Sequence, residues 1–251
     1  MAGHNKWSKI KRHKAKTDQR RSKIWARISR DITVAAREGG GDPGMNASLA
    51  LAIEKAKAEN MPKDNIERAI KRGTGEIQGE DYEEVTYEGY GPHGVAVFVE
   101  TLTDNRNRTV ADLRHLFSKG GGSLGKSGSV AYLFERKGVI EISSSGPPHD
   151  ELALFEIVAE AGAEDMQQEG DAYLIVTPPD LLEDVRRALE RAGAEISEAE
   201  LIREPSTTVA LSGDDARKVL RLIGHIDDHQ DVQAVFTTLD TDEETLAALS
   251  F

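Results

Sequence analysis

The apolar residues of the first third of the chain recur every three to four positions and predict three helices. The first helix spans residues 22–38 and ends at a run of three glycines, 39–41. Asn46 can cap the second helix, and Pro62 opens a third, short helix that stops at Gly73. This part is therefore predicted to be a small helical domain. A helix-turn-helix reader of DNA is an alternative, although the second helix shows no cluster of base-reading side chains.

After the third helix, the apolar period shortens to two, which is typical of strands. Short strands at 85–87 and 95–99 flank a Gly-Pro turn at 91–92. A helix at 108–119 and a strand at 130–134 are predicted to follow them.

A complete β-α-β-β-α-β pattern then fills residues 138–203, which is the order of a ferredoxin-like domain. Its predicted elements are a strand at 139–142, a helix at 150–161, strands at 165–169 and 173–176, a helix at 180–192 and a strand at 195–202.

The remaining elements, strand 207–211, helix 214–226 and strand 232–236, form the second half of another such pattern, whose first half begins at 95–99. The predicted fold class is therefore α+β: a small N-terminal helical domain plus two ferredoxin-like domains, one inserted into the other. The predicted parts are a basic arm, 1–21; the helical domain, 22–79; a discontinuous domain, 80–137 and 204–240; the inserted domain, 138–203; and an acidic C-terminal tail, 241–251.

Charge separates the start of the chain from the rest. Residues 1–30 hold eleven Lys and Arg against one acid, Asp18, whereas the whole chain has a net charge of −12. Such an arm can seek phosphate while the acidic body keeps the protein off nonspecific sites. Trp7 weighs against an idle tail, and the preference for Lys, without an apolar stripe before Ile24, weighs against a mitochondrial transit peptide.

The arm mixes cations for phosphates with rings that stack on bases, which favours nucleic-acid binding. The candidate residues in it are His4, Lys6, Trp7, Lys9, Lys11, Arg12, His13, Lys14, Lys16, Arg20, Arg21 and Lys23.

The segment Gly120–Ser127 matches the phosphate-loop pattern G-x-x-x-x-G-K-[ST]. A phosphate loop follows a strand and opens a helix, but here a predicted helix precedes the segment and a predicted strand follows it. We therefore favour a glycine-rich connection over a nucleotide site. Lys126 and the loop amides could still touch a nucleic-acid phosphate, and Arg106 and Arg108 could add contacts beside a cap of the helix that follows them.

No catalytic site is predicted. His225 and His229 stand four residues apart, but they straddle a predicted helix end, and no third ligand is fixed by spacing. We expect no metal, no cofactor and no enzymatic activity. The chain has no cysteine, which fits a reducing cytoplasm, and no apolar run is as long as a membrane span. A soluble, cytoplasmic protein without a membrane partner is expected.

Several motifs resemble the YebC/PmpR family over nearly the whole chain. They are Met1–Lys11, Gly41–Pro43, Asn60–Ile66, Tyr87–Pro92, Gly94–Ala96, Thr103–Thr109 and Gly128–Val130. The resemblance implies three domains, a cytoplasmic location and control of gene expression, with no established catalytic site. Bacterial members are described as DNA-binding transcriptional regulators and also as acting at the ribosome, and mitochondrial members are translational activators. Because the first motif begins at Met1, the bacterial branch without a transit peptide is expected.

The predicted function is a non-enzymatic regulator of gene expression that binds nucleic acid. Promoter DNA is favoured by the resemblance, whereas a basic arm with one aromatic residue and no major-groove reader favours structured RNA, such as ribosomal RNA. A phosphate-loop enzyme and a pure protein scaffold are the alternatives from other classes. The sequence defines neither the target nor the oligomeric state.

Overall fold

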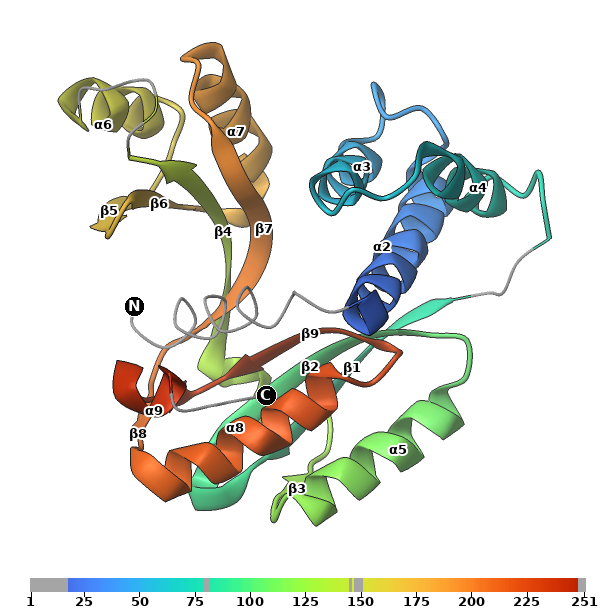
Figure 1. Cartoon of the computed structure of the whole chain (residues 1–251), viewed down its shortest axis with the longest axis vertical. Coiled ribbons are helices and arrows are strands. Elements are labelled where there is room, and N and C mark those ends of the chain that lie inside the picture. The colour runs from blue at the N-terminus through green and yellow to red at the C-terminus, as the bar shows by residue number, and fades with distance from the viewer. Residues whose placement is uncertain (1–17, 79–81, 145, 147–150, 248–251) are drawn as a thin grey trace. The chain divides into compact units, whose positions relative to one another are not determined.

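The computed structural model describes residues 18–78, 82–144, 146 and 151–247 (Figure 1). The fold is α+β, with an N-terminal helical part and antiparallel sheets. The chain divides into two compact units: unit 1 contains residues 1–133 and 205–251, and unit 2 is the continuous stretch Phe134–Glu204. Among the described helices, none has the length and apolarity needed to cross a membrane.

The three predicted N-terminal helices are confirmed as α2 (Asp18–Gly39), α3 (Ala47–Ala58) and α4 (Lys63–Gly73). Asn46 joins the first two of them. Its Oδ1 accepts the Leu49 N–H at 3.0 Å and caps α3, while its Nδ2 donates to the carbonyls of Ala35 and Gly40 at the end of α2. These helices share a core that includes Ile28, Ile32, Leu49, Ala56 and Ala69.

Gly73 explains how closely α4 approaches α2. A Cβ on Gly73 would lie 2.3 Å from the Thr33 carbonyl oxygen, so only glycine allows the two helices to pack at this distance.

Unit 1 also contains a four-stranded sheet in the order β3-β1-β2-β9, which consists of β1 (Glu83–Tyr90), β2 (Ala96–Thr103), β3 (Ser123–Leu124) and β9 (Val232–Thr237). β1 and β2 form an antiparallel hairpin, and β9 pairs antiparallel with the other edge of β2. The helices α5 (Arg106–Lys119) and α8 (Gly213–Asp227) supply Leu113, Phe117, Val219 and Ile223 to one core with β2 and β9. Figure 1 shows these two helices side by side against the sheet.

Two strand predictions in unit 1 were wrong. Residues 131–133 form a 3₁₀ turn, and the next strand, β4 (Phe134–Ser143), belongs to unit 2. The segment 207–211 contains only the two-residue β8 (Val209–Ala210), which pairs parallel with β10 (Leu239–Asp240) outside the main sheet. The sheet of unit 1 is therefore not the predicted ferredoxin-like one, because β1 and β3 occupy one side of β2. The short helix α9 (Glu243–Ala247) lies in the predicted tail.

Unit 2 has the β-α-β-β-α-β order that its sequence pattern predicted. It consists of β4, α6 (Glu151–Glu160), β5 (Asp165–Glu169), β6 (Ala172–Thr177), α7 (Leu182–Arg191) and β7 (Ile196–Pro205), with the strand order β5-β6-β4-β7. Leu154 and Val158 of α6 and Val185 and Leu189 of α7 pack into one core with Ile140, Ile142 and Ile175 of the sheet.

Candidate nucleic-acid interface

Most of the predicted binding residues lie in the arm. His4, Lys6, Trp7, Lys9, Lys11, Arg12, His13, Lys14 and Lys16 lie outside the described residues. Arg20 and Arg21 belong to the first turns of α2, where only the backbone is described. Lys23 is the first arm residue whose side chain is described, and it is exposed.

A basic row on α2 continues from Lys23 and contacts the loop after α8. Lys23 Nζ lies 3.9 Å from the carboxylate of Asp228, and Arg27 Nη1 lies 3.3 Å from that of Asp227. Arg30 donates to the carbonyl of Gln230. The spacing 23, 27, 30 puts all three on one helix face, which the sequence could have shown. Their partners in the sequence, Asp228, Asp227 and the carbonyl of Gln230, lie about two hundred positions away, so no local pattern indicates them.

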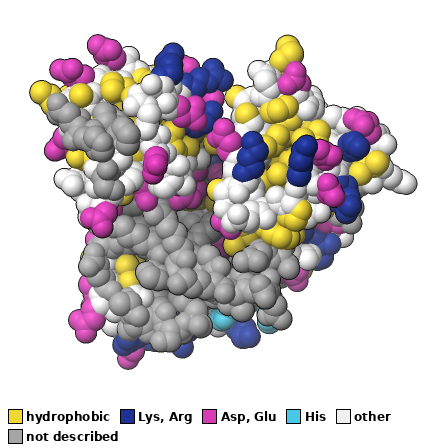
Figure 2. All heavy atoms as spheres, turned by 45° about the horizontal axis from the view of Figure 1, so that its top comes forward, with side chains coloured by type: hydrophobic (Ala, Val, Ile, Leu, Met, Phe, Trp, Pro, Cys, Tyr) yellow, Lys and Arg dark blue, Asp and Glu magenta, His cyan; other side chains and the backbone are white. Residues whose placement is uncertain are grey.

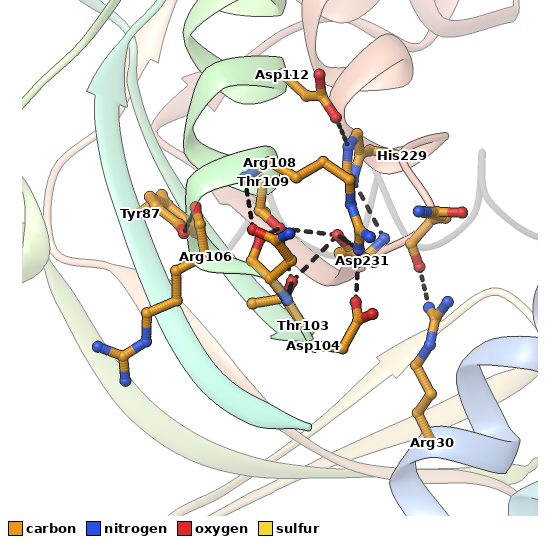
Figure 3. Close-up of polar contacts among 12 residues, drawn as sticks. Arg30, Tyr87, Thr103, Asp104, Arg106, Arg108, Thr109, Asp112, His229 and Asp231 are labelled. Atoms are coloured by element: carbon orange, nitrogen blue, oxygen red, sulfur yellow. Dashed lines mark hydrogen bonds and ion pairs between the residues drawn. The ribbon is translucent and has the colours of Figure 1, made fainter. Parts of the chain in front are cut away.

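Arg108 is held by two carboxylates (Figure 3). Its Nη2 lies 2.7 Å from Asp104 Oδ1 and 2.8 Å from Asp231 Oδ2. Hydrogen bonds to Asp231 and then to Asp104 raise the pKa of Arg108. Its predicted phosphate contact therefore competes with an internal ion pair. The neighbouring cap is observed, because Asn105 Oδ1 accepts the Arg108 N–H.

Asp231 is the centre of this polar cluster, and its side chain is only 1% exposed. Its Oδ2 also accepts from Thr109 at 2.8 Å and from Thr103 at 3.3 Å. Burial raises the pKa of Asp231, but the bonds from Arg108 and Thr109 outweigh burial and bring the pKa below its ordinary value. The cluster ties the end of β2 and the first turn of α5 to the loop after α8.

His229 belongs to the same loop. Its Nδ1 accepts the Asp231 N–H at 3.2 Å, and its Nε2 lies 3.2 Å from Asp112 Oδ2. Both ring nitrogens therefore have protein partners that hold the loop. Within the part of the chain that the structure describes, no group of three or more His, Cys, Asp or Glu could hold a metal.

Arg106 and Lys126 are both exposed. The Arg106 guanidinium lies 2.5 Å from a carboxylate oxygen of Glu83. The Arg106 carbonyl accepts from the Tyr87 hydroxyl (Figure 3). An exposed ion pair of this kind contributes little stability and can exchange for a phosphate.

The backbone amides that follow the phosphate-loop match bind a side chain of the protein itself. The backbone N–H groups of Gly128, Val130 and Ala131 donate to the carboxylate of Glu88 at 2.6, 2.7 and 2.8 Å. Glu88 is 4% exposed, so its carboxylate is a buried anion that backbone amides hold directly after the match. α5 precedes the match, the short strand β3 lies within it, and a 3₁₀ turn follows it, so the match does not open an α-helix. These three amides lie outside Gly120–Ser127, so the contact of the loop amides with a nucleic acid stays a prediction.

Sequence reasoning missed two further candidates. Tyr132 follows the glycine-rich loop and is 73% exposed, a position suited to stacking on a base. Its exposure was not predicted, because residues 130–134 were expected to form a strand and instead contain the 3₁₀ turn. Exposed cations on α3 and α4 also extend the basic surface of the helical part, and Figure 2 shows Lys and Arg side chains gathered there. These cations are Lys55, Lys57, Lys63, Arg68, Lys71 and Arg72.

The chain is therefore an α+β protein in which a basic helical part precedes two regions with antiparallel sheets. Residues 5–76 match the TACO1/YebC protein N-terminal domain, and residues 82–239 match the TACO1/YebC second and third domain. The chain therefore belongs to the TACO1/YebC family, and the predicted family is confirmed.

Relatives and a solved structure agree with this assignment. A protein of Salinibacter ruber is 55% identical over 98% of this chain and 96% of its own length. A protein of Pelotomaculum thermopropionicum is 51% identical over 97% of this chain and 100% of its own. Both are named probable transcriptional regulatory protein. The crystal structure of a conserved hypothetical protein from Aquifex aeolicus superposes with a TM-score of 0.83 at 45% identity, covering 94% of this chain and 96% of that one.

Proposed function

We propose that this protein is a non-enzymatic regulator of gene expression that binds nucleic acid through its basic arm and the basic face of its helical part. The observation that carries the proposal is the charge separation: eleven cations and one acid in residues 1–30 of a chain with a net charge of −12. The names of the relatives, probable transcriptional regulatory protein, support the same class of function.

The face of α2 gives this proposal a physical mechanism. Lys23 and Arg27 pair with the carboxylates of Asp228 and Asp227, and phosphates can replace these carboxylates as partners of the same cations. Binding would then exchange internal ion pairs for phosphate contacts and release counterions from the nucleic acid.

The test is deletion of residues 2–21, with binding measured against duplex DNA, structured RNA and ribosomes over a range of salt concentrations. If the arm makes about six phosphate contacts, the log–log slope of affinity against salt is roughly −5 for duplex DNA and roughly −4 for single strands. The deletion should flatten this slope and weaken binding strongly. The control is Arg187→Gln with Arg191→Gln, which removes two exposed charges of α7, outside the proposed surface, and should leave the slope unchanged. Equal affinity of the truncated and intact chains would refute the proposal.

The second candidate function is an RNA- or ribosome-associated translation factor. The exposed positions of α3 include Ala47, Ser48, Glu54, Lys55 and Lys57, and they lack the Asn, Gln and Arg side chains that read base edges in the major groove. That surface favours recognition of shape and phosphate over recognition of a DNA sequence. In the same assay, tighter binding to ribosomes than to any duplex, at equal salt, would select this candidate.

A further inference from the structure

Helix α6 in unit 2 is apolar on two faces. Its inner face places Leu154 and Val158 in the core of unit 2, where both are fully buried. Its outer face places Leu152, Phe155 and Ala159 on one exposed stripe at helical spacing, with Leu152 65% exposed and Phe155 52% exposed. A helix with apolar side chains on two of its faces is typical of one that is covered on both.

The other helix of the same unit provides an internal comparison. α7 packs into the same core through Val185 and Leu189, but its exposed positions are charged: Asp184, Arg187, Glu190 and Arg191. The exposed apolar stripe of α6 is therefore a property of that helix and not a general feature of the unit. An exposed Phe and Leu side by side mark a contact surface more often than a free one.

Acidic side chains surround the stripe. Glu151, Glu156 and Glu160 are all exposed on α6, and unit 2 as a whole has eighteen Asp and Glu against six Lys and Arg. In Figure 2, apolar and acidic side chains lie next to one another over the part of unit 2 that holds α6. The acidic rim repels nucleic-acid phosphates and anionic lipid headgroups, and two copies of α6 face to face would bring glutamates together.

We propose that the outer face of α6 is a docking site for another protein that presents a basic amphipathic helix. The apolar side of that helix would cover Leu152, Phe155 and Ala159, and its Lys and Arg residues would pair with Glu151, Glu156 and Glu160. The site is separate from the nucleic-acid surface proposed above, so the protein would hold a phosphate-bearing partner through unit 1 and a basic protein through unit 2.

The test uses the full-length, ¹⁵N-labelled protein and a synthetic 18-residue amphipathic helix made of Leu and Lys. The peptide should shift the amide resonances of α6 and leave those of α7 in place. Phe155→Ser and, independently, Leu152→Ser should each weaken binding at least tenfold, and Glu156→Lys should weaken it as well. The control is Leu201→Ser, which makes the same change at a 39% exposed leucine of β7 and should leave binding unchanged. Unchanged melting temperatures establish that the variants are folded.

Four results would overturn the proposal. One is equal binding of the peptide to the wild type and to Phe155→Ser, which would mean attraction by net charge alone. The others are preference for a Leu and Glu peptide of the same length, self-association that Phe155→Ser abolishes, and binding of anionic vesicles through α6. Each of these results would mean that the stripe binds something else or nothing. None of them would change the interpretation of the deletion of residues 2–21.

Discussion

Replacing Asp231 with Asn tests whether the polar cluster of unit 1 holds the loop after α8 in place. The substitution keeps the size and shape of the side chain and removes its charge. One oxygen becomes an NH₂ group, and the remaining neutral oxygen is a weaker acceptor than a carboxylate for the guanidinium of Arg108 and the hydroxyl of Thr109. Both of these groups donate to the same oxygen, Oδ2, at 2.8 Å.

The expected loss in the free energy of unfolding follows from how deeply the two charged groups are buried. Removing one partner of a buried ion pair costs about 3–5 kcal/mol, because the remaining charge loses its partner without regaining water. Asp231 is 1% exposed, but the side chain of Arg108 is 36% exposed and keeps its bond to Asp104. Solvent and Asp104 therefore offset part of the loss, and we expect Asp231→Asn to lower the free energy of unfolding of unit 1 by about 2–3 kcal/mol at pH 7. Asp104→Asn is the matched control, since it removes the more exposed carboxylate from the same guanidinium and should cost less than about 1 kcal/mol.

The pH dependence has a definite sign. The pKa of Asp231 is lowered in the folded protein, so its contribution is present above the ordinary aspartate pKa of about 3.9 and is lost as pH falls through the lower, folded value. The stability difference between the wild type and Asp231→Asn should thus be constant from pH 7 to about pH 5 and shrink below about pH 4.

Hydrogen exchange measured across a urea series gives the free energy of opening for β2, α5 and β9 separately from unit 2. If Asp231→Asn costs no more than Asp104→Asn, or if the difference persists unchanged at pH 3, the cluster does not stabilise the loop through the charge of Asp231.

Four further outcomes are expected. Glu88→Gln should cost about 2–4 kcal/mol, because three amides lose a charged acceptor, and it should speed hydrogen exchange at Gly128. Asn46→Ala should lower stability by about 2 kcal/mol in thermal unfolding, because it removes a cap and two further bonds. Lys126→Ala should leave nucleic-acid binding largely intact, and calorimetry should detect no Mg-ATP binding to either protein. Replacing 138–203 with a short Gly-rich linker should leave a cooperatively unfolding remainder, as expected if this stretch is an inserted domain; a molten remainder would contradict the insertion.

The helices of the N-terminal part could be predicted because their signals are local. Asn46 and Pro62 begin α3 and α4, and the glycines after α2 end it, so each boundary is marked within a few residues. The strand predicted at 130–134 failed for the opposite reason. Val130 and its apolar neighbours have the composition of a strand, but Glu88, some forty residues earlier, binds the amides there and turns the chain.

The residues of the candidate site also divide into those that local spacing indicates and those that only the fold brings together. The basic row on α2 and the cap at Asn105 are encoded in residue spacing. The role of Arg108 is not, because its second carboxylate comes from Asp231, 123 positions later in the chain. Spacing therefore identified a cation near a helix start, and only the fold shows that the protein itself supplies the anion.

The pairing of β2 with β9 sets an order on how the chain can fold during synthesis. β2 ends at Thr103 and β9 begins at Val232, so about 130 residues must be made before that edge of β2 can be closed. At about 5–20 residues per second, the delay is roughly 6–25 seconds. The whole of unit 2 is translated within this interval and can collapse on its own, since it is one continuous stretch. Throughout that time β2, whose side chains are almost all buried in the finished protein, presents an open edge to other nascent chains. The nascent protein is thus most exposed to aggregation and to chaperone binding at β2, and this exposure ends only when β9, in the last tenth of the chain, is made.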